Sequence, residues 1–179
     1  MRIIAGIFRG RRLNPPGNLP VRPTTDMARE ALFNILRNRV EFEQVDVLDL
    51  FSGTGAVSFE FLSRGVKQVT SIDQNPKCVD FQRQTAEKLE VNNIFPLRMD
   101  VFNFLGRSRQ RFDLIFADPP YDLKQLELIP SLVLPKFLKA GGLFVLEHSA
   151  QHSFTDNPFF MEQRHYGKVN FSFFQTEEE

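Results

Sequence analysis

From residue 45 onward the chain alternates short apolar segments with segments of helical periodicity, and this alternation restricts the fold more than any other feature of the sequence. The segments expected to form strands are 45–51, 68–73, 95–100, 112–118 and 141–149. The segments expected to form helices lie between them, at 55–64, 75–91, 101–106 and 124–138. Strands joined by helices pair in parallel through right-handed crossovers. The sequence therefore predicts an α/β fold with a Rossmann-like, doubly wound and mostly parallel sheet.

The two ends of the chain add smaller elements to this sheet. Residues 159–175 have the pattern of an antiparallel hairpin that turns at Gly167, which brings the sheet to seven strands. Residues 2–13 predict a short β-hairpin, because two apolar pieces flank a glycine. A helix is expected to follow from Thr24 or Thr25, since threonine side chains suit the N-terminus of a helix.

Composition indicates a soluble globular protein. Apolar residues make up 42% and charged residues 25% of the 179 positions. Cys78 is the single cysteine, so an internal disulfide is excluded, and no His/Cys/Asp cluster suggests a metal site. No apolar run approaches the roughly 20 residues that span a membrane. We therefore expect a cytoplasmic protein that uses neither metal nor membrane.

Positive charge is concentrated at the start of the chain. Residues 1–40 contain eight Arg, no Lys and two acidic residues, which gives +6 there and −6 in the remainder of a chain with zero net charge. This pattern favours a local anion-binding surface, although a solvated basic face would leave the same signature. We expect a basic hairpin-and-helix extension over 1–40, packed on a main domain over 41–176.

A glycine-containing loop follows the first buried strand and has the features of a ligand-binding turn. Gly53 and Gly55 allow the backbone to turn tightly and to approach a ligand closely. The dinucleotide pattern G-x-G-x-x-G is absent, because its third glycine position is Ser58. Asp49 precedes the loop, where a carboxylate repels a pyrophosphate but accepts hydrogen bonds from a cationic ligand. Asp49, Phe51, Gly53 and Gly55 are therefore candidate cofactor-binding residues.

Two more acids end the next two predicted strands. Asp73 lies 20 residues after Gly53, where an acid typically holds two ribose hydroxyls. Asp100 ends the following strand and is placed to accept from an adenine amino group, with Val101 beside it. Together with Asp49, these residues predict a pocket for an adenosine that carries a positively charged amino-acid tail.

A fourth motif, Asp118-Pro119-Pro120-Tyr121, ends the strand over 112–118. The two prolines stiffen the loop and leave its carbonyls free to face a pocket. The Asp118 carboxylate and the Pro119 carbonyl can accept from one amino group and orient its nitrogen toward a methyl donor. Tyr121 offers a flat face for an unstacked base. These four residues are the candidate catalytic loop.

The chain resembles the bacterial 16S ribosomal RNA guanine-N2 methyltransferases, a family of class I S-adenosylmethionine-dependent methyltransferases. The segments that carry the resemblance are IIAGIFRGRRL, RPTTDMAREALFNIL, DLFSGTGAVSFEFLSRG and DPPY, collinear over about residues 1–149. The resemblance implies S-adenosylmethionine as cofactor, with Asp49, Gly53 and Gly55 at its methionine end, Asp73 at the ribose and Asp100 at the adenine. It implies methylation of a guanine amino group in 16S RNA, within the small ribosomal subunit or an assembly intermediate.

The basic extension over 1–40 supplies the candidate RNA-contacting residues, which are Arg9, Arg11, Arg12, Arg22 and Thr24. The competing interpretations are a DNA adenine-N6 methyltransferase or another amino-base methyltransferase, which use the same loop and donor, and a non-catalytic RNA-binding module. The last would explain the basic extension but leaves the three aligned acids and the glycine loop without a role. Glu147 and His148 only partly match the family pattern, and a structural role is expected for His148.

Overall fold

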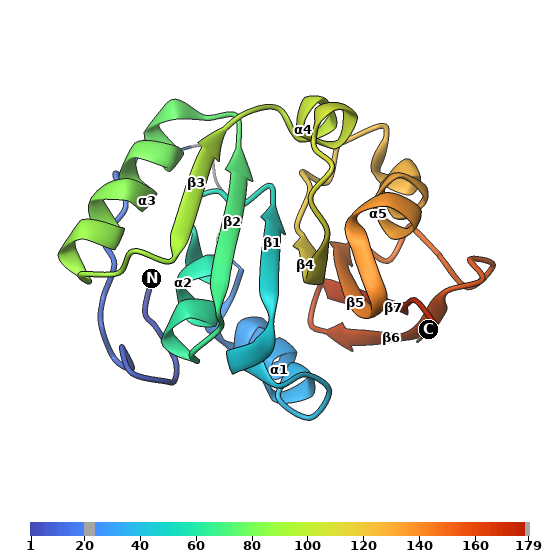
Figure 1. Ribbon diagram of the computed structural model, residues 1–179, viewed down its shortest axis with the longest axis horizontal. Helices are drawn as coiled ribbons and strands as arrows, with labels where there is room; N and C mark the ends of the chain where they lie inside the picture. Colours follow the sequence, from blue (N-terminus) through green and yellow to red (C-terminus); the bar gives the residue numbers. More distant parts are fainter. Residues whose placement is uncertain (20–23, 178–179) are drawn as a thin grey trace.

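The computed structural model describes residues 1–19 and 24–177. A seven-stranded sheet runs through the molecule in the order β3-β2-β1-β4-β5-β7-β6 (Figure 1). The strands are β1 (Asp46–Leu50), β2 (Gln68–Asp73), β3 (Ile94–Arg98), β4 (Phe112–Ala117), β5 (Leu138–His148), β6 (Phe160–Tyr166) and β7 (Val169–Gln175). The first five pair in parallel, whereas β7 lies antiparallel between β5 and β6. The predicted doubly wound, mostly parallel sheet with a closing hairpin is confirmed.

Helices cover both faces of the sheet. They are α1 (Asp26–Leu36), α2 (Ala56–Ser63), α3 (Pro76–Lys88), α4 (Val101–Arg107) and α5 (Ile129–Phe137), with short 3-10 turns at Phe42–Gln44 and Leu126–Leu128. Apolar residues of α1, α2 and α3 share one core cluster, and those of α4 and α5 share a second cluster on the opposite face. Neighbouring residues of β1 divide between them, with Val47 in the first cluster and Leu48 in the second. This explains the continuous apolar run of the strand.

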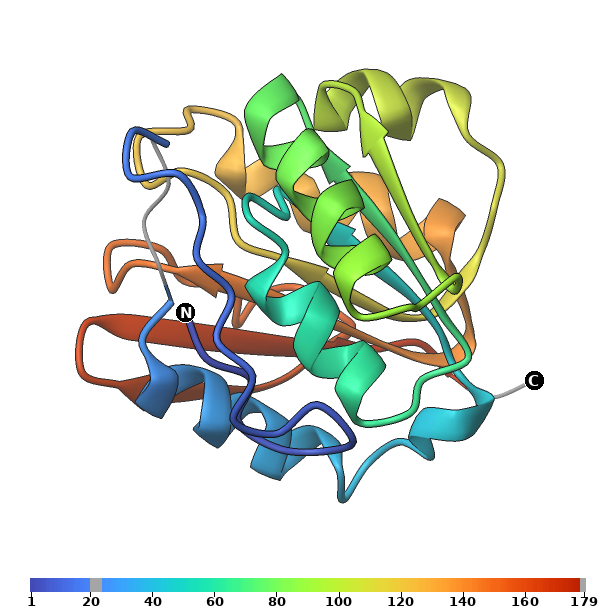
Figure 2. The same ribbon diagram turned by 90° about the vertical axis from the view of Figure 1, so that its left-hand side faces the viewer.

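The change of helix layer creates the position of the site. The crossovers from β1 to β3 pass through α2 and α3 on one face, and those from β3 to β5 pass through α4 and α5 on the other. Adjacent strands β1 and β4 therefore send their chains to opposite faces. The crevice beyond their carboxyl ends is the usual ligand position in such sheets. The loops that follow β4 and β5 lie at this same end of the sheet (Figure 2).

Several element boundaries differ from the predicted ones. The helix expected over 124–138 is divided into a 3-10 turn and α5, and β5 begins at Leu138 rather than at 141. The strand expected to reach residue 100 ends at Arg98. The predicted N-terminal hairpin is present in short form. Arg2 and Arg12 make an antiparallel bridge, Met1 and Leu13 exchange two backbone hydrogen bonds at 2.9 Å, and the Ile3 N–H donates to the Arg11 carbonyl at 3.0 Å. The residues between the two paired ends form an irregular connection, and residues 1–13 together make up the N-terminal arm.

This N-terminal arm lies along α2. The Ile7 N–H donates to the Ser63 carbonyl at 2.8 Å, at the carboxyl end of α2, and the Thr54 hydroxyl contacts the Met1 sulfur at 3.5 Å near its amino end. Ile3 and Leu13 of the arm are buried in the same core cluster as α2 and the sheet. The arm is thus continuous with the main core, and the division into 1–40 and 41–176 stays a prediction. No helix in the described part of the chain is long and apolar enough to cross a membrane.

Candidate active site

The loop between β1 and α2 is a tight turn that depends on its glycines. The Gly55 N–H donates to the Ser52 carbonyl at 2.8 Å, and Gly53 and Gly55 have φ values of +54° and +82°. A Cβ added at Gly55 would lie 3.0 Å from both the Gln82 and the Phe59 side chains. Left-handed backbone and lack of space therefore both require glycine there.

Asp49 is the most unusual charged group of the site. Its side chain is 1% exposed, one carboxylate oxygen accepts from the Ser58 hydroxyl at 2.5 Å, and the other oxygen has no hydrogen-bond partner among the described residues. Burial raises the pKa of Asp49 to about 7; the Ser58 hydrogen bond opposes this shift, and the charges of Asp118 and Asp73 reinforce it. A buried acceptor without a donor costs free energy, so this oxygen fits a cationic ligand that would donate to it.

Asp73 fixes the glycine loop as well as ending β2. One oxygen accepts from the Gly53 N–H at 2.8 Å, and the other accepts from the Asn75 N–H at 2.8 Å. A carboxylate offers about four lone pairs, so two remain for hydroxyl donors such as those of a ribose. The predicted ribose-binding role is compatible with this geometry, but the residue also has a structural role that the sequence pattern did not reveal.

Asp100 and Phe51 border the same end of the sheet. Asp100 is the N-cap of α4, because one of its oxygens accepts from the Asn103 N–H at 3.0 Å, and the buried Val101 follows it. Phe51 adopts a left-handed backbone conformation with φ of +59°, and its ring meets Phe102 edge-on at 6.5 Å. Strained backbone of this kind concentrates at functional sites. Both phenylalanines therefore place apolar surface beside the predicted adenine position.

The Asp118–Tyr121 loop lies beside the glycine loop. Leu50 and Ala117 are register partners on β1 and β4, and the Asp118 N–H donates to the Leu50 carbonyl at 3.3 Å. Pro119 is buried, whereas Pro120 and Tyr121 are exposed. The charge of Asp118 contributes to the raised pKa of Asp49, so the two carboxylates lie within electrostatic range of each other. The structure thus brings the predicted catalytic loop and the predicted cofactor loop together.

The candidate RNA-contacting arginines are spread along the arm. Arg9, Arg11 and Arg12 are exposed, and no salt bridge within the described part of the chain involves them. Arg12 lies near the glycine loop, because the carbonyl of the next residue, Leu13, accepts from the N-terminal ammonium there. Arg9 lies toward the carboxyl end of α2, two residues after Ile7, whose N–H donates to the Ser63 carbonyl. Arg22 lies outside the described residues. Thr24 is half-buried and precedes Thr25, which is the N-cap of α1.

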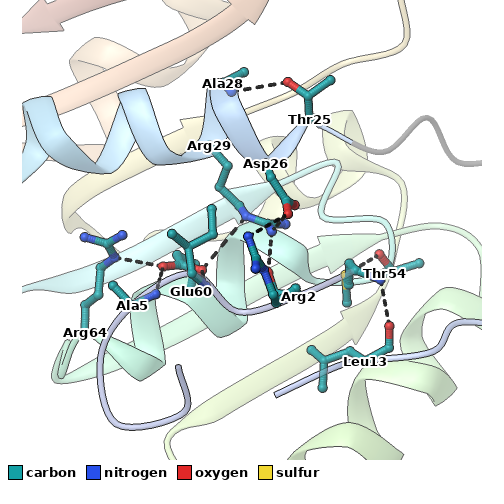
Figure 3. Close-up of polar contacts among 12 residues, drawn as sticks. Arg2, Ala5, Leu13, Thr25, Asp26, Ala28, Arg29, Thr54, Glu60 and Arg64 are labelled. Atoms are coloured by element: carbon teal, nitrogen blue, oxygen red, sulfur yellow. Dashed lines mark hydrogen bonds and ion pairs between the residues drawn. The ribbon is translucent and has the colours of Figure 1, made fainter. Parts of the chain in front are cut away.

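Other arginines of the basic segment have structural partners (Figure 3). Glu60, fully buried on α2, accepts from the Ile4 and Ala5 N–H groups at 2.9 and 3.1 Å and from Arg64 at 3.0 Å. Arg29 lies 3.9 Å from the same carboxylate.

Arg29 also links this carboxylate to the start of the chain. It donates to Asp26 at 2.9 Å and to the Arg2 carbonyl, and Arg2 itself lies 3.5 Å from Asp26. Arg39 pairs with Glu162 on β6. The arginines of residues 1–40 therefore differ in their surroundings. Arg29 and Arg39 pair with acids of the main domain, whereas the arginines at 9, 11 and 12 are exposed.

Two further buried polar residues lie near the site, one with an expected structural role and one that the sequence analysis missed. His148 is fully buried, with its ring nitrogens 2.8 Å from the Ser149 carbonyl and 2.7 Å from the Ser172 hydroxyl, which supports the structural role expected for it. Gln82 on α3 is fully buried under the glycine loop and was not singled out in the sequence. A lone glutamine in an amphipathic helix carries no signal of such a contact. No group of three or more His, Cys, Asp or Glu within the described ranges could hold a metal ion.

A Rossmann-like sheet, three acids around a glycine loop and an adjoining Asp-Pro-Pro-Tyr loop define a class I methyltransferase. The family model described as "Conserved hypothetical protein 95" matches residues 1–175, and the chain belongs to this family. It is 34% identical over 157 residues to ribosomal RNA small subunit methyltransferase D of Haemophilus influenzae, covering 82% of this chain and 78% of that protein. The protein of the same name from Buchnera aphidicola is 31% identical over 148 residues, covering 82% of this chain and 75% of its relative.

A solved structure supports the same grouping. The Escherichia coli protein YhhF, whose assignment as a methyltransferase is provisional, superposes with a TM-score of 0.88 at 28% sequence identity. The superposition covers 100% of this chain and 99% of that one. The arm and the β6–β7 hairpin are therefore shared parts of the architecture rather than additions to it.

Proposed function

We propose that this protein transfers a methyl group from S-adenosylmethionine to the N2 amino group of a guanine in 16S ribosomal RNA. The methyltransferase class and the relatives named for the small-subunit RNA support the reaction and the substrate. The base and its N2 atom are inferred from the Asp118-Pro-Pro-Tyr loop and from the resemblance of the collinear segments over about residues 1–149 to the guanine-N2 enzymes.

The observation that carries the proposal is the pairing of Asp49 and Asp118 on adjacent strand ends. Asp49 keeps a buried acceptor for a cationic donor, and Asp118 follows the neighbouring strand one register position beyond Ala117. A methyl donor held at the first residue and an amino group held at the second would meet at the crevice between β1 and β4. Holding two reactants in line in this way accounts for up to roughly 7–11 kcal/mol of barrier reduction.

Each residue has a defined part in the proposed mechanism. S-adenosylmethionine would supply a sulfonium methyl group; as the attacking nitrogen forms its bond to the methyl carbon, the carbon–sulfur bond would break and leave a neutral thioether. Asp49 accepts from its ammonium group and Asp73 from its ribose hydroxyls. The Asp118 carboxylate and the Pro119 carbonyl accept from the guanine amino group and direct its lone pair toward the methyl carbon. One proton leaves the methylated nitrogen for Asp118 or water, and Tyr121 stacks on the base.

The arm is proposed to hold the RNA backbone next to the target base. Arg9, Arg11, Arg12 and Arg22 would contact phosphates, which position a nucleic acid without reading its sequence. The rest of the chain is net negative, so the arm provides the attraction. Residues 1–40 would then act as an RNA-binding extension of the domain over 41–176, and the small ribosomal subunit or its assembly intermediate would be the substrate.

A methyl-transfer assay with defined substrates tests the proposal. The purified protein is incubated with isotopically labelled S-adenosylmethionine and with small ribosomal particles, free 16S RNA or duplex DNA, and the digested nucleosides are identified by mass spectrometry. We expect labelled N2-methylguanine from a ribosomal substrate. Labelled N6-methyladenine from DNA would assign the competing DNA activity, and binding of RNA without any labelled nucleoside would favour the non-catalytic module.

A further inference from the structure

Gln82, in the middle of α3, lies directly beneath the glycine loop. Its Nε2 donates to the Gly53 carbonyl at 2.7 Å and to the Ser52 hydroxyl at 2.9 Å, and its Oε1 accepts from the Ser71 hydroxyl at 2.6 Å. The side chain is completely buried, and both amide protons are used. Gln82 therefore joins three elements, which are α3, β2 and the loop that leads into α2.

Both polar groups of Gly53 are fixed by this arrangement. Asp73 accepts from its N–H at 2.8 Å, and Gln82 draws its carbonyl toward α3. The carbonyl of one residue and the N–H of the next point in opposite directions in a trans peptide, and the described residues contain no cis peptide bond. The Thr54 N–H consequently points away from α3. None of the hydrogen bonds between described residues uses this N–H as donor.

We propose that Gln82 is a positioning residue for the methyl donor. It holds the Gly53 carbonyl toward α3, and this orientation presents the Thr54 N–H to the carboxylate of the donor's amino-acid end. The inference rests on the proposed function, and it complements the position of Asp49. An amino-acid tail carries one ammonium and one carboxylate. The buried Asp49 oxygen suits the ammonium, and an N–H at a helix-preceding turn suits the carboxylate.

Two ligands that differ only in the carboxylate test the proposal by calorimetry. S-adenosylmethionine has the carboxylate, and decarboxylated S-adenosylmethionine lacks it but keeps the ammonium and the sulfonium. Gln82→Met keeps the length of the side chain but removes both donors, so the Gly53 carbonyl loses its partner and the peptide can rotate. We expect the variant to bind S-adenosylmethionine roughly 10- to 100-fold more weakly, which corresponds to loss of one hydrogen bond to a charged group. Its affinity for the decarboxylated ligand should stay within about threefold of the unmodified protein.

Three further variants separate positioning from folding. Gln84→Met changes an exposed glutamine of the same helix and should alter neither affinity. Ser71→Ala is a milder change, which leaves the Gln82 amide donors in place but removes the Ser71 hydroxyl that donates to Gln82 Oε1 and orients the amide. It should give a smaller loss of the preference for S-adenosylmethionine over the decarboxylated ligand, and it provides this test even if Gln82→Met does not fold. Gln82→Glu should regain the preference for S-adenosylmethionine at low pH, where a protonated carboxyl again donates to the Gly53 carbonyl.

The outcomes are distinguishable. An equal loss of affinity for both ligands would mean that Gln82 only supports the fold, and unchanged affinity for S-adenosylmethionine in Gln82→Met would also overturn the proposal. Failure of the unmodified protein to bind S-adenosylmethionine would instead refute the proposed function. The ratio of the two affinities is the decisive quantity, because the titration of Asp49 affects both ligands through the same ammonium group.

Discussion

Replacing Asp49 with asparagine should make the ligand-free protein more stable at pH 8. Burial raises the pKa of Asp49 from 3.8 to about 7, a difference of about 3 units that corresponds to about 4 kcal/mol at 1.36 kcal/mol per unit. An asparagine keeps an acceptor for the Ser58 hydroxyl but adds an unpaired N–H, which costs about 1–2 kcal/mol. We therefore expect Asp49→Asn to raise the free energy of unfolding at pH 8 by about 2–3 kcal/mol.

The dependence on pH provides the sharper measurement. Because the pKa of Asp49 is higher in the folded than in the unfolded state, folding takes up a proton between about pH 4 and pH 7. This group therefore destabilises the fold progressively as the pH rises through that window, and its full cost is reached above about pH 7. Urea denaturation of both proteins from pH 4 to pH 8 should show Asp49→Asn about 1 kcal/mol less stable near pH 4, where the unpaired N–H dominates, and an advantage of the variant that grows toward pH 8.

The same carboxylate should make donor binding dependent on pH. Only ionised Asp49 attracts the ammonium of S-adenosylmethionine, so the affinity should fall about tenfold per unit below pH 7, and Asp49→Asn should abolish this dependence while binding more weakly at pH 8. Calorimetry at several pH values measures both effects. A variant that is less stable than the unmodified protein at pH 8, or that keeps the dependence on pH, would refute the assignment of a buried, unpaired carboxylate.

Three further predictions concern the catalytic loop and the arm. Asp118→Ala should nearly abolish methyl transfer but leave the Kd for S-adenosylmethionine within about threefold, because Asp118 is proposed to contact the base rather than the donor; activity within about threefold of normal would remove its orienting role. Replacing Arg11 and Arg12 with alanine should raise the RNA KM more than it lowers kcat and reduce the salt dependence of RNA affinity by roughly 0.7–0.9 per lost contact, whereas early melting with an unchanged salt slope would make the pair structural. Gly6→Ala should cost about 1–3 kcal/mol in a thermal melt, because the added Cβ would lie 1.8 Å from the Ser63 carbonyl oxygen at a φ of +84°; unchanged stability would show that the arm moves freely on α2.

The sequence predicted the elements that depend on residues close to one another along the chain. The strand over Gln68–Asp73 has its predicted bounds. The start of α3 at Pro76 follows from its N-cap Asn75, a signal confined to two adjacent positions. The parallel pairing followed from the alternation of elements, and the meeting of Asp49 and Asp118 followed from the rule that ligands bind beyond parallel strand ends.

Local patterns failed where a long-range contact decided the conformation. The hairpin of the arm was predicted from its glycines, but the sequence did not reveal that Gly6 also allows the backbone to approach Ser63 of α2, more than fifty residues away. The basic segment was interpreted as one surface, but Glu60 and Asp26 bind part of it. Asp100 was placed on a strand, whereas the cap of α4 holds it just beyond the strand end.

The sequence by itself determined the order of elements, the parallel sheet and the identity of the residues at its carboxyl edge, because each depends on periodicity or on residue types within a few positions. Only the tertiary structure decided how these residues are held. It buried one oxygen of Asp49 without a partner, turned both oxygens of Asp73 onto backbone N–H groups, and placed Gln82 under the Gly53 carbonyl. Such contacts join residues up to thirty positions apart, and their hydrogen bonds form only when packing brings helix, strand and loop together.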